Sequence, residues 1–318
     1  MNNDVVVFSG QAHPEFAHEM CDLLGVELSP TRVTRFSNDC LQVQLRDNCR
    51  QRDVYIVQPV CPPTQENIME LLMMVDAARG ASAAQVNVVM PHYAYARSDK
   101  KDAPRISVGG RLVADLLATA GATRVLTMTL HSEQVHGFFS MPVDHLTALP
   151  VLAEHYKGRH LSNAVVVSPD FGNAKAAGRF ARALGVEVAA GSKRRTADDE
   201  VIIDAIVGDV AGKDIIILDD EIATGGSIVT LIEAVQEHDV TSISVACTHG
   251  LFSGRAAERL NAVPDIDEIV TTNTVPQDKQ IDRLVTLSVA PLFAEAVRRI
   301  HLGESVSTLF SEESTYGE

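Results

Sequence analysis

Residues 214–228, DIIILDDEIATGGSI, hold the strongest indication of the fold in this chain. The run IIIL is apolar throughout and rich in β-branched residues, which is typical of a strand buried on both faces. Two adjacent carboxylates, Asp219 and Asp220, follow it, and TGGS (224–227) then leads into a helical pattern. Glycines let backbone N–H groups approach an anion closely, and a helix N-terminus adds positive potential. The stretch therefore predicts a buried strand, an anion-binding loop and a helix.

The chemistry of this loop suits a phosphorylated sugar. The hydroxyls of Thr224 and Ser227 can donate to phosphate oxygens. A phosphate held there would bring the vicinal diol of an attached ribose within reach of Asp219 and Asp220. The simpler interpretation is an exposed turn in which Ser227 caps the helix. An apolar strand, two aspartates and TGGS in this order are more specific than a lone glycine loop, so we predict a ribose-phosphate site.

Short β-branched runs alternate with helical patterns, such as residues 65–79, along the whole chain. This alternation is typical of an α/β fold with parallel sheets covered on both faces, in which ligands bind at the carboxyl ends of the strands. The pattern runs through two comparable blocks, so we predict two domains, residues 1–146 and 147–318. The predicted strands are 4–8, 53–58, 86–90, 124–128, 164–168, 214–219, 242–247, 267–271 and 284–288.

Composition limits the classes of partner. The 318 residues carry a net charge of −15, which disfavours a general nucleic-acid surface. No apolar run approaches the ~20 residues that span a bilayer, and the opening MNNDVVVFSG is unlike a signal peptide. The five cysteines form no CxxC pair, which favours a reducing cytoplasm over a disulfide framework or a zinc site. We therefore expect a cytoplasmic protein that binds small molecules and neither nucleic acid nor membrane.

Basic residues nevertheless gather at two places, around Arg97 and Lys100 and at KRR (193–195). Either group could be a solvated loop, which is the usual role of a charge run. Lys193 and Arg195 alternate in an extended segment, so that both could face one anionic ligand.

Nine segments carry a resemblance to a known family: FSGQAHPE (8–15), RFSND (35–39), NIMELLMMVDA (67–77), YARSDKKD (95–102), LTMTLHSEQVHGFF (126–139), VSPD (167–170), KRR (193–195), THGLFSG (248–254) and AEAVRRIHLGESVSTLF (294–310). In these segments the chain resembles the ribose-phosphate pyrophosphokinase family. The resemblance implies two tandem type I phosphoribosyltransferase-like domains, and transfer of the β,γ-diphosphate of Mg·ATP to the C1 hydroxyl of ribose 5-phosphate. It further implies Mg²⁺ as cofactor and a homohexamer built from dimers, in which a neighbouring subunit contributes to the ATP site.

The resemblance also implies roles for individual residues. Lys193 and Arg195 would lie on a loop that closes over the transferred group, where preorganised cations stabilise the charge of diphosphoryl transfer. His131 and Asp170 would hold Mg²⁺, which prefers a few protein ligands plus substrate phosphates, and His136 is interpreted as structural. The implied ATP-binding residues are Phe36, Asn38, Arg97, Ser98, Asp99 and His131. The implied ribose-5-phosphate residues are Asp219, Asp220, Ala223, Thr224, Gly225, Gly226 and Ser227.

Several positions depart from the residues that are commonest in that family. Ala223 replaces an acidic residue, so the sugar would be oriented by Asp219, Asp220 and the metal. Phe171 and Asn173 stand where Ala and Gly are common, in a segment that should approach the sugar. At the remaining departures, which are Cys40, Ser98 and Glu133, the resemblance leaves nucleotide preference and allosteric regulation open.

Three other functions stay open. A phosphoribosyltransferase shares the sugar-phosphate loop but has no use for the ATP segments 35–39 and 95–102. A pyrophosphokinase acting on a modified ribose phosphate would fit the departures near the sugar. A non-catalytic regulatory homologue would be expected to lose Lys193, Arg195 or the aspartate pair, and this chain keeps them.

Overall fold

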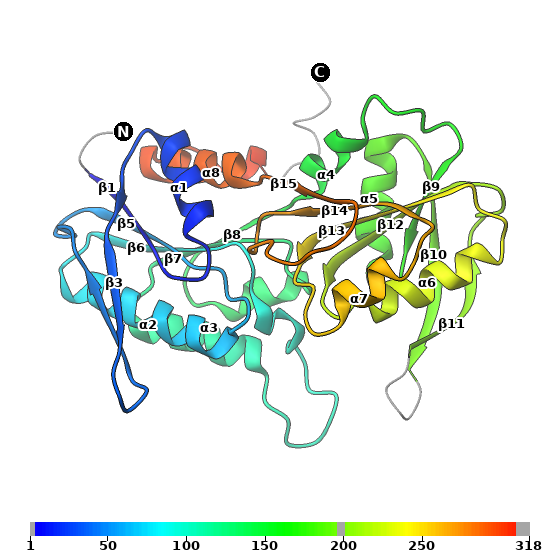
Figure 1. Ribbon diagram of the computed structural model, residues 1–318. Helices are drawn as coiled ribbons and strands as arrows, with labels where there is room; N and C mark the ends of the chain where they lie inside the picture. The colour runs from blue at the N-terminus through cyan, green and yellow to red at the C-terminus, as the bar shows by residue number, and fades with distance from the viewer. Residues whose placement is uncertain (1–3, 196–200, 310–318) are drawn as a thin grey trace. The chain divides into compact units, whose positions relative to one another are not determined.

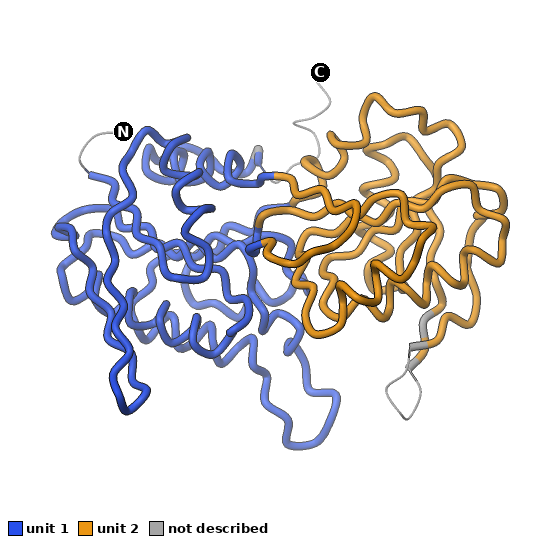
Figure 2. Tube along the Cα trace, in the orientation of Figure 1, with its two compact units in different colours: residues 1–147, 274–276, 288–318 blue, residues 148–273, 277–287 orange. Residues whose placement is uncertain are grey.

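Two largely parallel sheets, each covered by helices on both faces, organise the chain (Figure 1). The computed structural model describes residues 4–195 and 201–309, except for the side chains of Lys193, Arg195, Val201 and Thr308. The chain divides into two compact units, which Figure 2 shows in separate colours. Unit 1 comprises residues 1–147, 274–276 and 288–318, and unit 2 comprises residues 148–273 and 277–287.

The sheet of unit 1 is parallel throughout, in the order β2-β1-β5-β6-β7-β8. Its central strands read as continuous apolar runs because both faces are covered, and Val7, Ile56 and Val88 have no exposed surface. The strands are β1 (Val5–Ser9), β2 (Leu28–Ser29), β5 (Asp53–Val57), β6 (Gln85–Met90), β7 (Arg124–Met128) and β8 (Val143–Leu146).

Helices cover both faces of this sheet (Figure 1). On one face α1 (Pro14–Leu24) packs against α8 (Ala290–Leu302), and the rings of Phe16 and Phe293 meet edge-on with centroids 5.5 Å apart. The other face carries α2 (Thr64–Gly80) and α3 (Gly109–Ala120), so the helix predicted over residues 65–79 is confirmed. Three short 3₁₀ segments in the described part of the unit are η1 (Ala94–Arg97), η2 (Glu133–Phe138) and η3 (Ser307–Leu309).

A separate antiparallel hairpin, β3 (Thr31–Arg35) and β4 (Leu41–Leu45), projects from unit 1. Val43 and Leu45 alternate with polar residues and pack against the core under α2, which anchors the base of the hairpin. Its turn is left outside that core.

The sheet of unit 2 has the order β11-β10-β9-β12-β13-β14-β15 and is parallel except for β11, which runs antiparallel to β10. Helices α4 (Leu149–Tyr156) and α5 (Ala174–Leu184) pack together on one face, and α6 (Gly226–Gln236) and α7 (Ala256–Asn261) on the other. The strands are β9 (Ala164–Ser168), β10 (Glu187–Arg195), β11 (Val201–Val207), β12 (Asp214–Ile222), β13 (Ser242–Gly250), β14 (Ile266–Thr272) and β15 (Leu284–Leu287).

The predicted α/β class with two parallel-sheet domains is confirmed, but the last helix is placed differently. The predicted division assigned residues 147–318 to the second domain, whereas α8 belongs to unit 1 because its apolar face packs on α1. Polar contacts fix the same arrangement: Nδ1 of His301 lies 2.8 Å from a carboxylate oxygen of Asp53, and the hydroxyl of Ser288 donates to Glu19.

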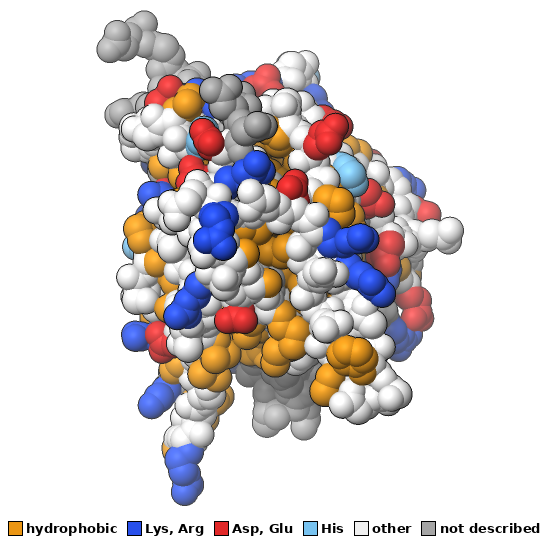
Figure 3. Space-filling model, turned by 90° about the vertical axis from the view of Figure 1, so that its left-hand side faces the viewer, with side chains coloured by type: hydrophobic (Ala, Val, Ile, Leu, Met, Phe, Trp, Pro, Cys, Tyr) orange, Lys and Arg blue, Asp and Glu red, His pale blue; other side chains and the backbone are white. Residues whose placement is uncertain are grey.

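The surface drawn in Figure 3 carries Lys and Arg side chains in small separate groups among acidic and apolar ones. Among the described helices, none is both long enough and apolar enough to cross a membrane. All five cysteines fall within the described residues and all are free thiols, of which Cys40 alone is exposed.

Candidate active site

Strand β12 runs three residues beyond its predicted end at 219, because Glu221 and Ile222 still pair with β13. Asp219 and Asp220 therefore lie inside the strand, close to its carboxyl end, rather than after it. The predicted boundary is wrong, yet the two aspartates remain at the expected edge of the sheet. The backbone N–H of Asp220 donates to Oδ1 of Asp219 at 2.9 Å, which holds the first carboxylate against the strand.

The surroundings of Asp219 are unfavourable for an isolated negative charge. Burial raises the pKa of its carboxyl well above the usual range, and the nearby charges of Asp220 and Asp170 raise it further. A buried group of this kind is stabilised by a cation or by hydrogen-bond donors. The end of β12 is thus suited to bind a partner that supplies positive charge or hydroxyl groups.

Asp170 follows β9, which pairs directly with β12, so the ends of the two strands lie side by side. Its Oδ1 accepts the backbone N–H of Asn173 at 3.1 Å. The side-chain amide of Asn173 in turn donates to the carbonyl of Leu218 at 2.8 Å. Asn173 thereby ties the Asp170 loop to the strand that carries Asp219. The ring of Phe171 next to Asp170 is 58% exposed.

The predicted anion loop connects β12 to α6. Gly225 has φ of 74°, in the left-handed region that favours glycine, and it is the N-cap of α6. Ser227 is therefore inside the helix, and its interpretation as the helix cap is wrong. The first N–H groups of a helix have no intrahelical acceptor, so those of α6 are suited to bind an anion beside the loop.

Lys193 and Arg195 lie in the antiparallel ribbon of β10 and β11, opposite Ile203 and Val201. The segment is extended, as predicted. The side chains of both residues lie outside the described part of the chain, so their catalytic role stays a prediction. Arg194 between them is exposed and donates to Asp204 at 3.1 Å.

The predicted ATP residues of unit 1 follow two neighbouring strands. Arg97, Ser98 and Asp99 come after β6, and His131 comes after β7, which pairs with β6. The Ser98 hydroxyl accepts the N–H of Gly109 at 2.8 Å, so it closes the loop that leads into α3. The predicted role of Ser98 in ATP binding stays a prediction.

His131 is exposed and is presented by a strained turn. Thr129 has φ of 41°, an uncommon value for a β-branched residue, and its N–H donates to Leu146 of β8 at 2.9 Å. The next N–H, of Leu130, donates to Nε2 of His145 at 2.9 Å. Two bonds from β8 therefore hold the turn that carries His131.

Phe36 and Asn38 lie in the turn between β3 and β4, apart from the strand ends of unit 1. Phe36 is 47% exposed, so it does not belong to the core of unit 1. The side chain of Asn38 makes a hydrogen bond within the turn, in which its Oδ1 accepts the N–H of Cys40 at 3.2 Å. Arg35 binds Asp39 at 2.5 Å and also Glu66 at the start of α2.

The donor set at the end of β12 fits Mg²⁺ in the mode in which substrate supplies most ligands. Within residues 4–195 and 201–309, no three His, Cys, Asp or Glu side chains are grouped closely enough to hold a metal ion alone. Mg²⁺ often binds through one or two carboxylates, with water and phosphate oxygens completing its shell. Asp170 in unit 2 provides such an oxygen, and His131 belongs to unit 1.

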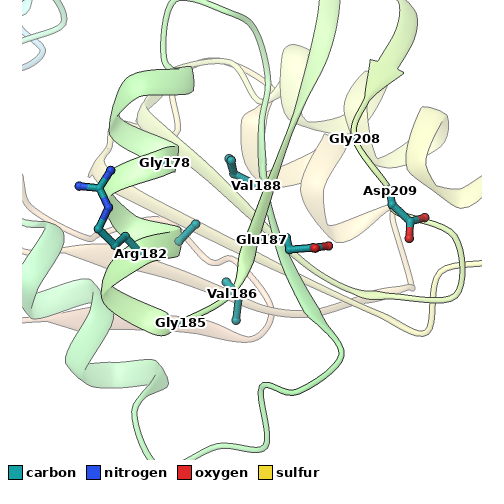
Figure 4. Close-up of a pocket in the computed structure, with 9 residues that line it drawn as sticks. Gly178, Arg182, Gly185, Val186, Glu187, Val188, Gly208 and Asp209 are labelled. Atoms are coloured by element: carbon teal, nitrogen blue, oxygen red, sulfur yellow. The ribbon is translucent and has the colours of Figure 1, made fainter.

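A surface depression of about 670 Å³ lies between α5 and the beginning of β10 (Figure 4). It is lined by Arg182, Glu187 and Asp209, among others. These residues lie at the amino end of β10, whereas the site residues lie at the carboxyl ends of the strands. The depression is therefore separate from the candidate active site.

Two residues that were not predicted from the sequence support the loop through its carbonyl groups. Ser253 and Arg259 both contact loop carbonyls, the first through its N–H and the second through its side chain. The available signal was their position: they follow β13, the neighbour of β12, and residues after adjacent parallel strands gather at one edge.

A parallel α/β unit with two aspartates near the end of a strand, followed by a glycine loop at a helix N-terminus, is typical of proteins that bind sugar phosphates. Two families match the chain: residues 5–121 match the N-terminal domain of ribose phosphate pyrophosphokinase, and residues 202–311 match the phosphoribosyl synthetase-associated domain.

Relatives that match over nearly their full length indicate the same family. The ribose-phosphate pyrophosphokinase of Deinococcus radiodurans is 50% identical over 315 residues, covering 96% of this chain and 98% of that protein. The enzyme of the same name from Bacillus subtilis is 42% identical over 312 residues, covering 98% of each. The crystal structure of phosphoribosylpyrophosphate synthetase from Mycobacterium smegmatis matches with a TM-score of 0.89 at 36% identity, over 95% of this chain and all of that one. The chain belongs to the ribose-phosphate pyrophosphokinase family.

Proposed function

We propose that this protein transfers the β,γ-diphosphate of Mg·ATP to the C1 hydroxyl of ribose 5-phosphate, giving phosphoribosyl diphosphate and AMP. The observation that carries the proposal is the Asp219–Asp220 pair near the end of β12, on the strand that leads into the glycine loop and the N-terminus of α6. Membership of the family supports the same reaction. Retention of Lys193 and Arg195 in the β10–β11 ribbon is also consistent with an active enzyme rather than a regulatory homologue.

The sugar phosphate would be bound by unit 2. The N–H groups at the start of α6 and the hydroxyls of Thr224 and Ser227 would hold its 5-phosphate. Asp219 and Asp220 would accept hydrogen bonds from the ribose hydroxyls. Such contacts fix the C1 hydroxyl in place, and positioning supplies a large part of the rate in phosphoryl transfer.

In the transfer itself, a bond forms between the C1 oxygen and the β-phosphorus of ATP, and the bond from that phosphorus to the α,β-bridging oxygen breaks. The C1 hydroxyl loses its proton and AMP leaves. Lys193 and Arg195 would stabilise the negative charge that spreads over the transferred oxygens. Arg97, Asp99 and His131 would bind ATP from unit 1.

We further propose that Asp170 and His131 help to hold Mg²⁺, which would neutralise phosphate charge when bound. The protein would act as a homohexamer built from dimers, in which exposed Phe36 and Asn38 contact the adenine held by a neighbouring subunit. The five free thiols support function in a reducing cytoplasm.

One assay tests the reaction: pure protein, Mg²⁺, ATP and ribose 5-phosphate, with AMP and diphosphorylated sugar followed over time. We expect both products in equal amounts, and none when the sugar phosphate is omitted. Failure to form AMP with any sugar phosphate would contradict the proposed activity.

A modified acceptor is the second candidate, favoured by the exposed ring of Phe171 beside Asp170. The same assay with a panel of substituted ribose phosphates separates the two. AMP formed with a substituted sugar and not with ribose 5-phosphate would select the second candidate.

A further inference from the structure

The segment after β13 supports the anion loop through its carbonyl groups. The N–H of Ser253 donates to the carbonyl of Ala223 at 2.7 Å. Nη1 of Arg259, on α7, donates to the carbonyl of Thr224 at 3.0 Å. Two consecutive carbonyls of the loop are thus bound by two residues of the segment 253–259.

These bonds fix the direction in which the loop presents its donors. In a planar trans peptide, the carbonyl of one residue and the N–H of the next point in opposite directions. With the carbonyls of Ala223 and Thr224 directed toward 253–259, the N–H groups of Thr224 and Gly225 point away from that segment. Successive N–H groups in such a turn form an anion-binding concavity, which continues here into the first turn of α6.

Arg259 lies beside the loop that its side chain supports. It is exposed, and a Cβ atom added to Gly226 would lie 3.6 Å from its Nη1, so its charge sits beside the start of α6. The neighbouring carboxylate of Glu258 is bound through both oxygens by Arg255, at 2.7 Å and 2.5 Å. Arg255 is the main cause of the lowered pKa of Glu258, with Arg259 the weakest contributor.

We propose that Arg259 is a positioning residue for the ribose-phosphate loop: it holds the Thr224–Gly225 peptide so that the Gly225 N–H faces the 5-phosphate. The proposal rests on the proposed function only in naming the sugar phosphate as the ligand. It places the effect of Arg259 on sugar-phosphate affinity, not on ATP and not on the fold.

Arg259→Ala, Arg259→Met and Arg255→Ala test it, each compared with wild type. Arg259→Met keeps an unbranched stem without donors, and Arg255→Ala removes an exposed arginine of the same segment that does not contact the loop. Calorimetric titration of ribose 5-phosphate without ATP, steady-state KM for each substrate, and Tm are measured. We expect both Arg259 variants to raise the Kd and KM for ribose 5-phosphate about tenfold, since a charged hydrogen bond is lost. The KM for ATP and the Tm should stay near wild type, and Arg255→Ala should change none of these values.

The outcomes separate this inference from the activity. Ribose 5-phosphate affinity equal to wild type in a folded Arg259 variant would overturn the positioning role while the activity stands. If the Arg259 variants bind ribose 5-phosphate more weakly than wild type, and wild type itself forms no AMP, the positioning role would stand and the proposed activity would be rejected. Equal loss of ATP and sugar-phosphate affinity, or failure of both Arg259 variants to fold, would also overturn it, because the role would then be general or structural.

Discussion

At the scale of single residues, β10 places three basic residues in a row at 193–195, and the middle one, Arg194, is engaged by Asp204. Lys193→Ala should lower kcat by about 10²–10³-fold, because it removes a preorganised cation from the transferred phosphate oxygens. Arg194→Ala is the matched control and should leave kcat near wild type. Steady-state AMP formation with a parallel thermal melt measures both. Near-normal turnover of Lys193→Ala would remove that residue from the mechanism.

Asn173 is expected to matter through Asp170. Its amide bond to the Leu218 carbonyl joins the ends of β9 and β12, so Asn173→Ala should loosen the Asp170 loop and raise the Mg²⁺ concentration needed for half-maximal rate by roughly tenfold. Asn163→Ala is the matched control. It removes a similar bond from a side-chain amide to a carbonyl, that of Gly212 at 2.8 Å, at the amino ends of β9 and β12. An equal change in both variants would point to general destabilisation instead.

The residues that sequence could predict are those whose chemistry is local. Asp219, Asp220 and Gly225 are read from one short stretch, because a strand end, an aspartate pair and a glycine turn are close in the chain. Arg259 acts on Thr224 from 35 positions away, and Asn173 acts on Leu218 from 45. Only the pairing of neighbouring strands brings these residues together, so their roles follow from the fold.

At the scale of elements, the central strands were predictable because both their faces are buried and their residues are apolar. The β3–β4 hairpin was missed because its strands are half-exposed and mostly polar, with only Leu41, Val43 and Leu45 alternating in a strand-like way. The extension of β12 was missed because Asp219 and Asp220 interrupt its apolar run. The two aspartates therefore indicate the position of the candidate site, but they also make the end of β12 hard to predict from the sequence.

Helix α8 carries a charge network that should make stability depend on pH. Arg298 and Arg299 bind Glu295 at 2.8 Å and 2.6 Å, and these bonds lower the pKa of Glu295 to about 2. A lowered folded-state pKa means that the stabilisation is complete above the usual value near 4.5 and is lost as pH falls toward 2. The carboxylate is about a third exposed, so we expect a contribution of about 1 kcal/mol or less.

Glu295→Gln measures this contribution. Urea unfolding at pH 5 and pH 3 should show that the variant differs from wild type less at pH 3 than at pH 5. Glu154→Gln, which removes an exposed pair with Lys157 at 2.7 Å on another helix, is the comparison variant. A difference between wild type and Glu295→Gln that does not shrink with falling pH would contradict the assigned network.

At the scale of the whole molecule, two α/β blocks were predictable from the alternation of strands and helices, but the position of the last helix was not. The amphipathic pattern of α8 predicts a helix with one buried face and does not identify the sheet or helix that covers it. Its partner is decided by packing, because Phe293 meets Phe16 and His301 meets Asp53. Neither contact can be predicted from the sequence, because the residues that make it are far apart in the chain.

Fragments should behave accordingly. Residues 148–287 contain the whole second sheet and should fold alone, with cooperative melting. Residues 1–147 should not, because removal of α8 exposes apolar surface on α1, and each buried side chain such as Phe16 or Met20 contributes about 1.5–3 kcal/mol. Circular dichroism and amide NMR dispersion measure both. Adding a peptide of residues 288–309 should restore structure to the first fragment, and a fragment 1–147 that folds without it would contradict the role of α8.

The dependence of α1 on α8 sets an order of events during protein synthesis. Residues 1–147 are made first, but the helix that covers α1 is made last, and at about 5–20 residues per second the roughly 155 residues from 148 to 302 take about 8–30 s to add. During that interval the nascent chain presents the apolar side of α1 uncovered, and the second unit has all of its strands once residue 287 is made, shortly before α8 is finished. The amino-terminal half is therefore expected to finish folding after the carboxyl-terminal half, and to need chaperone protection in the meantime.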